Sequence, residues 1–368
     1  MKITKAPQKS EDMHNQKIKL CALPQVPERK FPVNINPRRA DIIRIIGKTW
    51  VNGTKIHYCF FDHTKGHNSP AEWTGSQEER QVVRAAFQQW KAVGIGLEFE
   101  EVDAPPDAEV RIGFQQGDGS WSYVGTDLLD IGLNQRTMNF GWPLATDSYG
   151  PETALHEVGH TLALPHEHQN PKAGIQWNED AVRASLSGPP NNWSPETIEY
   201  NILRKIPINE VESSEWDPNS IMHYQFQAEL ISSPAPYNLE GIFPEPGLSQ
   251  KDKDWMQKFY PVLESNDYIE LKPFVSVPLV LSPGEQVNFI VKPEISRDYK
   301  FQTFGEVDTV MVLFEEDNGD PRYLDGDDDG GTDSNALITQ KLLKGRTYIL
   351  RVRLYFASLS GETAVMMW

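Results

Sequence analysis

The chain has 368 residues, of which 39% are hydrophobic and 24% charged, a balance typical of a globular protein with a real core and room for two domains. Its net charge of -17 argues against nucleic acid and against an anionic membrane surface as the main partner. The sequence holds no apolar run of the roughly 18 residues that a membrane span needs, so we expect no span.

The first 45 residues are polar and contain scattered prolines, without a helical or strand period. This composition favours an extended leader or prosegment. The same stretch lacks the apolar core expected of a secretory signal. It contains Cys21, and the chain's other cysteine is Cys59, so one disulfide between them is one interpretation and a plain buried thiol is another.

Regular structure is expected after the leader. Residues 54–61 (TKIHYCFF) have strand composition, and residues 76–93 predict a helix that begins with a capping box of Ser76 and Glu79 and buries one apolar face. Further short strands are expected at residues 97–102 and 108–114. Strands and helices in this order indicate an α+β fold with a mixed sheet.

Two capped helices and a β-rich tail are expected later in the chain. Ser194 caps a predicted helix with Pro195 in its first turn, and Ser249 caps another that ends before Pro261. From about residue 265, β-rich runs alternate with Gly, Pro and Asp turns, which is the rhythm of a β-sandwich of roughly 100 residues. We therefore divide the chain into residues 1–45, 46–264 and 265–368.

Residues 154–171 (ALHEVGHTLALPHEHQNP) gather four of the nine histidines. His156 and His160 are four residues apart, so on a helix both side chains lie on one face and can bind a single zinc ion. Pro165 turns the chain after this helix, which lets His166 fold back as a third ligand. Glu157 points to the side of the imidazole pair, where a carboxylate can act as general base toward water.

The pattern H-E-x-x-H-x-x-A-x-x-H, together with the later NSIMHYQF, resembles the signature and Met-containing turn of metzincin metalloproteases, and among them astacins most closely. The stretches GSWSYVG and TMNFGW add to this resemblance, which covers residues 46–262. It implies a zincin catalytic domain with one catalytic Zn²⁺ bound by His156, His160 and His166. It also implies that Glu157 is the general base of a zinc endopeptidase.

The resemblance assigns further roles around the expected metal. Met222 would form an apolar floor beneath it, and Tyr224 would be a switchable ligand that moves to stabilise the oxyanion. The alternative for Tyr224 is a buried aromatic ring with a satisfied hydroxyl. Glu167 matches the position that meets the free N-terminus of a mature astacin. His168 and His223 are expected beside the metal ligands or on the surface.

Two positions extend or depart from the family pattern. Astacins have glycine where this chain has Ala163, and a positive φ there would cost alanine about 1 kcal/mol, so we expect a locally altered turn but an intact site. In the leader, Cys21 offers a thiolate that would cap the zinc and keep the enzyme latent, as metzincin prosegments do. This remains an alternative to the disulfide and to the buried thiol.

The tail has its own candidate site. Asp325, Asp327 and Asp329 alternate before Asp333, as at the start of a calcium loop, but the closing glutamate is replaced by Ala336. Calcium binding and a solvated acidic turn are both open. The tail resembles bacterial pre-peptidase C-terminal domains, which implies a non-catalytic accessory module.

Three functions are compatible with the pattern. The first is a zinc endopeptidase that acts on a protein or peptide substrate as a monomer, with the extended peptide adding to an exposed sheet edge at GSWSYVG or TMNFGW. The second is a catalytically silent zinc-binding adhesion or recognition protein, and the third is a zinc hydrolase of a non-peptide bond. The resemblance suggests a secreted enzyme. An intact Glu157 favours the first function, because a binding protein needs no general base.

Overall fold

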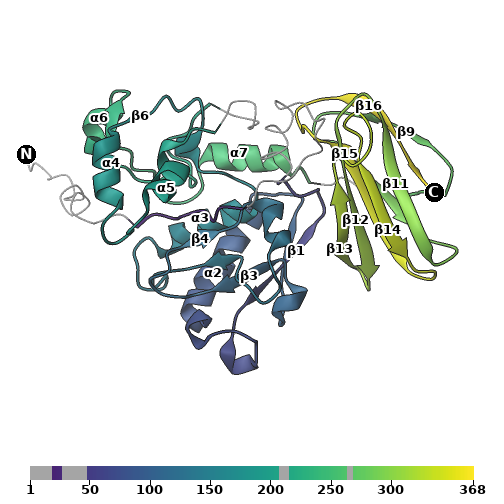
Figure 1. Ribbon diagram of the computed structural model, residues 1–368, viewed down its shortest axis with the longest axis horizontal. Coiled ribbons are helices and arrows are strands. Elements are labelled where there is room, and N and C mark those ends of the chain that lie inside the picture. Colours follow the sequence, from purple (N-terminus) through teal and green to yellow (C-terminus); the bar gives the residue numbers. More distant parts are fainter. Residues whose placement is uncertain (1–18, 27–47, 207–214, 263–267) are drawn as a thin grey trace, which may run out of the picture.

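A computed structural model of the protein describes residues 19–26, 48–206, 215–262 and 268–368. Figure 1 shows an α/β part beside a β-sandwich at the C-terminal end, which confirms the predicted α+β fold. The predicted boundary at residues 264 and 265 lies outside the described residues, as does most of the predicted leader. Among the described helices, none combines the length and apolarity required to cross a bilayer.

The α/β part contains helices, short strands and 3₁₀ turns. Its helices are α2 (Gln77–Ala92), α3 (Gly150–Thr161), α4 (Glu179–Leu186), α5 (Pro195–Ile198), the π-helical turn η7 (Glu199–Leu203), α6 (Tyr237–Glu240) and α7 (Gln250–Phe259). Its strands are β1 (Lys55–Phe60), β2 (Glu98–Glu101), β3 (Val110–Gly113), β4 (Trp121–Ser122), β5 (Met138–Asn139), β6 (Gln176–Trp177) and β7 (Ile231–Ser233).

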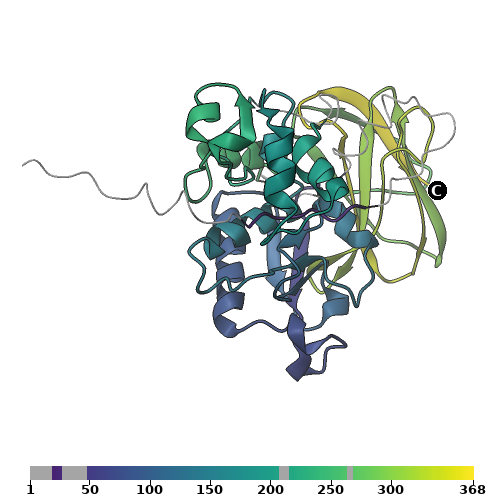
Figure 2. The same ribbon diagram turned by 60° about the vertical axis from the view of Figure 1, so that its left-hand side comes forward.

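The main sheet has the order β2-β1-β3-β5-β4. Strands β1, β2, β3 and β5 run parallel, and β4 pairs antiparallel with β5. Strand β4 is therefore the edge of the sheet, and it comes from the GSWSYVG stretch that was expected to supply one. Figure 2 shows α3 packed beside this sheet, with the leader crossing the same region.

Helix α2 anchors the sheet to α3. Its predicted capping box is present, with the Ser76 hydroxyl bound to the backbone N–H of Glu79 and the Glu79 carboxylate to that of Ser76. Its apolar face packs into the core, where the rings of Phe87 and Tyr58 stack at 4.3 Å. Local capping and periodicity thus predicted this helix correctly.

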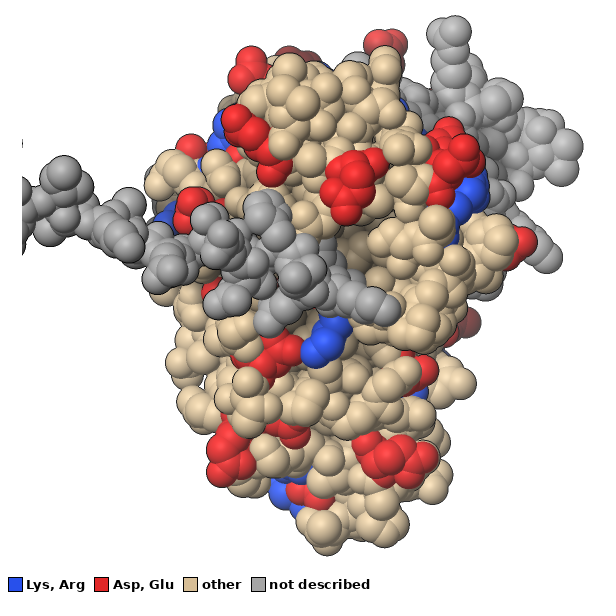
Figure 3. Space-filling model, turned by 90° about the vertical axis from the view of Figure 1, so that its left-hand side faces the viewer, with Lys and Arg blue, Asp and Glu red and all other residues tan. Residues whose placement is uncertain are grey.

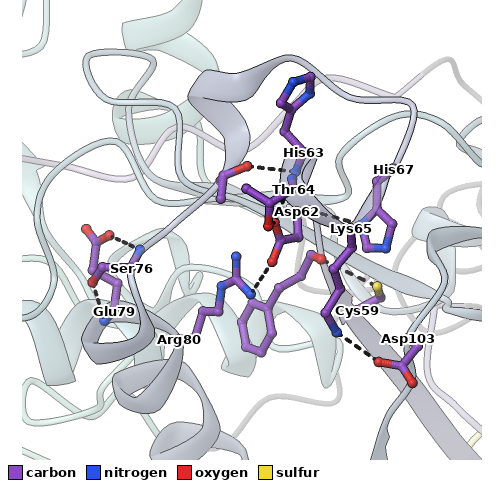
Figure 4. Close-up of polar contacts among 12 residues, drawn as sticks. Cys59, Asp62, His63, Thr64, Lys65, His67, Ser76, Glu79, Arg80 and Asp103 are labelled. Carbon is purple, nitrogen blue, oxygen red and sulfur yellow. Dashed lines mark hydrogen bonds and ion pairs between the residues drawn. The ribbon is translucent and has the colours of Figure 1, made fainter.

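The sequence did not predict the buried ion pair that fixes the start of α2. Arg80 is buried on α2, and its Nη1 donates to Asp62 Oδ2 at 2.9 Å, as Figure 4 shows beside the capping box. Burial alone would raise the pKa of Asp62, but hydrogen bonds from Thr64 and Arg80 lower it to about 2. The pair links the residues that follow β1 to the first turns of α2.

The β-sandwich consists of two sheets, β13-β12-β15-β10-β8 and β14-β11-β16-β9, around an apolar core. Its strands are β8 (Ile269–Glu270), β9 (Val277–Leu281), β10 (Gln286–Val291), β11 (Arg297–Gly305), β12 (Thr309–Asp317), β13 (Asp320–Asp327), β14 (Leu337–Leu342), β15 (Thr347–Leu354) and β16 (Gly361–Met367). The β-rich runs expected from residue 265 correspond to β9, β10, β11, β12, β14 and β15, and no run was expected at β8, β13 or β16.

Candidate metal centre

Helix α3 and the turn that follows it bring three histidines together. His156 and His160 lie on one face of α3, as the spacing predicted. Ala163 ends the helix with a φ of 69°, the backbone conformation in which astacins have glycine. The N–H of Leu164 then donates to the carbonyl of Gly159, and this tight reversal returns the chain so that His166 faces the other two rings.

The three imidazoles converge through one nitrogen each. Nε2 of His160 lies 3.1 Å from Nε2 of His156 and 3.1 Å from Nε2 of His166. A tetrahedral ion with bonds of about 2.0–2.1 Å to nitrogen sets its ligand atoms about 3.3 Å apart. The separations therefore suit three ligands of one zinc ion.

The other ring nitrogens fix the orientation of two of these histidines. Nδ1 of His156 lies 2.8 Å from the carbonyl oxygen of Ile221, and Nδ1 of His160 lies 2.7 Å from that of Leu164. A neutral imidazole that donates from Nδ1 presents a lone pair at Nε2. Burial lowers the pKa of His156 to about 4 and lowers that of His160 and His166 well below its usual range. Three lone pairs facing one another favour a shared cation, so the residues fit zinc.

Glu157 lies against this cluster and is fully buried. Its Oε2 lies 3.5 Å from Sγ of Cys21, and its Oε1 has no hydrogen-bond partner among the described residues. Burial raises the pKa of Glu157 to about 8, and the contact with Cys21 opposes this shift. A buried carboxylate with one free oxygen has a raised affinity for a proton.

The Met-containing turn is held under α3 from two sides. A Cβ on Gly159 would lie 2.4 Å from Sδ of Met222, so glycine lets the Met222 side chain pack directly against the helix. On its other side, the turn is bound by Asp252 at the start of α7, which accepts hydrogen bonds from the hydroxyl of Ser220 and the N–H of Ile221. Helix α7 thereby positions Met222 next to the histidine cluster.

Tyr224 faces the same cluster. Its hydroxyl lies 2.6 Å from Nε2 of His166 and donates to the carbonyl of Cys21. His168 stacks on the Tyr224 ring at 4.7 Å, and His223 bonds the carbonyl of Tyr224 through Nδ1. Of the two expected positions, beside the metal ligands or on the surface, the structure has the first: His168 and His223 are buried, and the ring of His168 lies 5.4 Å from that of His166. Neither belongs to the group whose ligand atoms converge.

The described part of the leader, residues 19–26, lies across this site (Figure 1). Sγ of Cys21 lies 3.7 Å from Nε2 of His160, and its ligand atom is within 4.8 Å of those of all three histidines. The N–H of Ala22 donates to the carbonyl of Ser120 beside β4. On the opposite side, the side-chain oxygens of Asn191 and Asn201 accept the N–H groups of Leu20 and Leu23. These two asparagines carry no motif, and the sequence did not identify them.

The disulfide interpretation of the two cysteines is wrong. Cys21 and Cys59 are both free and buried, and Cys59 lies within β1, where its thiol donates to the carbonyl of Phe60. Burial, followed by the charge of Glu157, raises the pKa of the Cys21 thiol well above its usual value.

Glu167 lies in the lining of a second cavity, of about 130 Å³, which His166 and Met222 also line. Its Oε1 accepts hydrogen bonds from the N–H of Asp217 and from the side chain of Asn170. Burial raises the pKa of Glu167 to about 7, although these hydrogen bonds lower it. A buried acidic group beside a cavity is compatible with the role that the resemblance gave it.

The calcium prediction receives no support from the described residues. Asp327 is the last residue of β13, and its Oδ2 accepts the N–H groups of Gly330 and Leu337, so it stabilises the turn. The acidic stretch belongs to neither group of metal-binding side chains in the described part of the chain. The second such group, around His57 and Asp320, already contains the ammonium of Lys55.

Comparisons with known proteins agree with this geometry. The family model of the astacin peptidases matches residues 46–235. A structure of myroilysin has 30% sequence identity and a TM-score of 0.51, and the match covers 59% of this chain and 97% of myroilysin. A second myroilysin crystal structure has 29% identity and a TM-score of 0.44, covering 62% and 97% of the two chains.

The C-terminal region matches a different solved structure. It is the pre-peptidase C-terminal domain of collagenase from Bacillus anthracis, with 13% identity, a TM-score of 0.25, and coverage of 29% of this chain and 99% of that domain. No curated protein sequence matched the chain. The family match extends over more than half of the 368 residues and includes the histidine cluster. The chain therefore belongs to the astacin family of peptidases and is a zinc-dependent metalloendopeptidase.

Proposed function

We propose that His156, His160 and His166 hold the catalytic zinc ion and that Glu157 is the general base of peptide hydrolysis. The convergence of three Nε2 atoms beside a buried carboxylate carries this proposal. A bound zinc ion supplies Lewis acidity, which lowers the pKa of water and polarises a carbonyl group. Residues 46–264 would form the catalytic domain, and residues 265–368 an accessory domain.

Glu157 would move the proton. Its Oε1 is buried and has no partner among the described residues, so it is available to accept a proton from the attacking water. The same carboxyl group then delivers the proton to the leaving amine. Burial keeps competing solvent away from this carboxylate.

Tyr224 is placed to bind the carbonyl oxygen. In the leader-bound structure its hydroxyl donates to the carbonyl of Cys21, a peptide carbonyl that lies beside the histidines. The same hydroxyl would donate to the scissile carbonyl of a substrate, where it stabilises the negative charge that develops on oxygen. Edge strand β4 would align the extended peptide by main-chain hydrogen bonds, as Ser120 does for Ala22.

The leader would keep the enzyme latent. Cys21 adds a sulfur to three imidazole nitrogens, which gives the four ligands of a closed zinc site. Catalytic zinc sites keep one position open for water or substrate. The full-length chain would therefore become active only when Cys21 leaves.

The deciding experiment uses the full-length chain with Cys21→Ala, loaded with zinc. The chain is incubated with a broad peptide library, and the cleavage products are identified by mass spectrometry. Adding Glu157→Gln should keep one zinc per chain and lower turnover by about 10³-fold, because proton transfer by a positioned group contributes about 10²–10⁴-fold. Glu72→Gln, at an exposed position, is the matched control and should cleave normally.

Two results would count against the proposal. Unchanged turnover of the Glu157→Gln chain would remove Glu157 from the mechanism. A zinc-loaded Cys21→Ala chain that cleaves no peptide in the library would argue against peptide hydrolysis at this site. Metal analysis of His166→Ala, which should lose stoichiometric zinc, tests the ligand assignment separately from activity.

A further inference from the structure

A cavity of about 560 Å³ opens beside His156 and Glu157, and leader residues 19–21 form part of its lining. Besides Glu157, three carboxylate residues line it: Asp147, Glu152 and Glu245. Apart from Lys19 of the leader, the described lining contains no lysine or arginine. The cavity therefore has an acidic wall whose basic partner comes from the leader itself.

Lys19 is bound in this cavity by charge and by an aromatic ring. Its ammonium donates to Oδ2 of Asp147 at 2.7 Å and lies 5.5 Å from the centroid of the Trp142 ring. The Asp147 side chain is 19% exposed, so the ion pair is partly shielded from water. An ammonium over an indole face adds a cation–π attraction to the ion pair.

Asp147 is preorganised for this contact. Its Oδ1 accepts the N–H of Tyr149, and its own carbonyl accepts the N–H of Gly150 at the start of α3. Oδ2 is thereby held toward the cavity. Burial alone would raise the pKa of Asp147, but the hydrogen bonds from Lys19 and Tyr149 lower it, which keeps the carboxylate charged.

Glu152 supplies a second acceptor in the same lining. Its Oε2 is buried and has no hydrogen-bond partner among the described residues. A buried carboxylate oxygen without a donor is costly, and a ligand that brings further N–H groups would satisfy it. Arginine has five such donors, so it suits the cavity at least as well as lysine. On the face shown in Figure 3, acidic side chains lie on both sides of a hollow.

The leader lies in the site as a peptide ligand would. The Cys21 carbonyl accepts a hydrogen bond from the Tyr224 hydroxyl, and the Ala22 N–H donates to the carbonyl of Ser120 beside β4. Lys19 is two residues from the carbonyl that faces the metal centre. We propose that the Asp147 cavity is a specificity subsite, so that the active enzyme prefers peptides with lysine or arginine within two residues of the cleaved bond. This inference rests on the proposed function.

The test uses the full-length chain with Cys21→Ala and Lys19→Gln, so that its own Lys19 does not occupy the Asp147 cavity. The substrates are peptides in which one position at a time, up to three residues from the middle of the peptide, is Lys, Arg, Gln, norleucine or Glu. At one of these positions, peptides with Lys or Arg should have a kcat/KM about fivefold higher than the peptide with Gln. This ratio is the effect of a partly exposed ion pair. Asp147→Lys should abolish this preference for Lys and Arg and should make Glu the preferred residue at the same peptide position. Asp130→Lys, an exposed site outside the cavity lining, is the matched control and should keep the preference.

A binding measurement separates this inference from the proposed function. A labelled peptide of residues 19–26, with alanine in place of Cys21, should bind the chain with Cys21→Ala and Lys19→Gln about fivefold more tightly than the same peptide with glutamine in place of Lys19. Equal affinities, or peptide cleavage without a basic preference, would overturn the subsite. Tighter binding of the lysine peptide together with no cleavage of any library member would support the subsite. The same result would contradict the proposed function.

Discussion

Sγ of Cys21 lies 3.7 Å from Nε2 of His160, so a leader residue faces the histidine cluster directly. The thiol, the three imidazoles and the general-base candidate Glu157 form one buried group. This arrangement joins two features that are more than a hundred residues apart in the chain. If the proposed latency holds, removal of Cys21 from the cluster decides whether the centre can accept a substrate.

Replacing Cys21 with alanine should activate the full-length chain. Loss of the sulfur would leave the zinc ion with three protein ligands and an open coordination position. It would also weaken the binding of the leader to the metal centre. Cleavage of a reporter peptide should rise by about tenfold or more, and a tenfold rise corresponds to about 1.4 kcal/mol of lost leader binding. Cys59→Ala, which removes a thiol within β1, should leave cleavage unchanged. Equal activity of the Cys21→Ala and parent chains would contradict latency through this thiol.

Replacing Tyr224 with phenylalanine should impair the chemical step more than substrate binding. The change removes one hydroxyl that donates to a carbonyl beside the metal centre but keeps the ring that stacks on His168. In the Cys21→Ala chain, kcat should fall by about 10²-fold, as when one oxyanion donor is lost, while KM and zinc content change little. Steady-state kinetics with metal analysis provide the readout. A kcat that stays at the parent value would leave Tyr224 as a packing residue.

Local patterns predicted the parts of the site that depend on neighbouring residues. The spacing of His156 and His160 predicted a shared helix face, and Ser76 with Glu79 predicted the start of α2. Such signals extend over three or four residues, so the sequence shows them directly. The same holds for the regular β-rich runs that became the sandwich.

Long-range contacts account for what the sequence did not predict. Leu20 bonds Asn191 across 171 positions, and Lys19 bonds Asp147 across 128, with no motif around either partner. The leader was expected to be extended, but its path along the site depends on such contacts. Strand β13 was missed for another reason, since its run of Asp, Pro and Gly residues is unfavourable for strands and the pairing with β12 overrides that preference.

Replacing Ala163 with glycine should stabilise the catalytic part. Ala163 has a φ of 69°, and this left-handed conformation costs a residue with a Cβ about 1–2 kcal/mol. Glycine removes that strain but adds about 0.4–1 kcal/mol of freedom to the unfolded chain. The free energy of unfolding in urea should therefore rise by roughly 0.5–1 kcal/mol. Ala181→Gly, within α4, is the reference and should lower it by about 1 kcal/mol. A loss at both positions would argue against strain at the end of α3.

The contact between the two parts of the chain should depend on pH through His57. This buried residue of β1 has Glu109 at Nδ1 (3.0 Å) and Asp320 of β13 at Nε2 (3.1 Å), with Lys55 and Arg322 also paired to Asp320. Only a protonated imidazole donates from both ring nitrogens. Burial lowers the pKa of His57, as does the charge of Arg322, but the hydrogen bond and charge of Glu109 and the charge of Asp320 outweigh them and raise it overall.

Because the pKa of His57 is higher in the folded chain, its contribution to stability is complete below about pH 6.5, the value for an unfolded histidine, and is lost as the pH rises through the folded value. The free energy of unfolding in urea should thus fall between about pH 5.5 and about pH 8.5, and the share of His57 should be near 1 kcal/mol, the net size of a typical hydrogen bond. His57→Gln should reduce this loss by about 1 kcal/mol, because glutamine carries no titrating charge. The rest of the loss belongs to Glu157 and Glu167, whose pKa values burial raises to about 8 and about 7. The control is His63→Gln at an exposed position, which should retain the full dependence, and a free energy of unfolding that responds to pH equally in both variants would place the titrating group elsewhere.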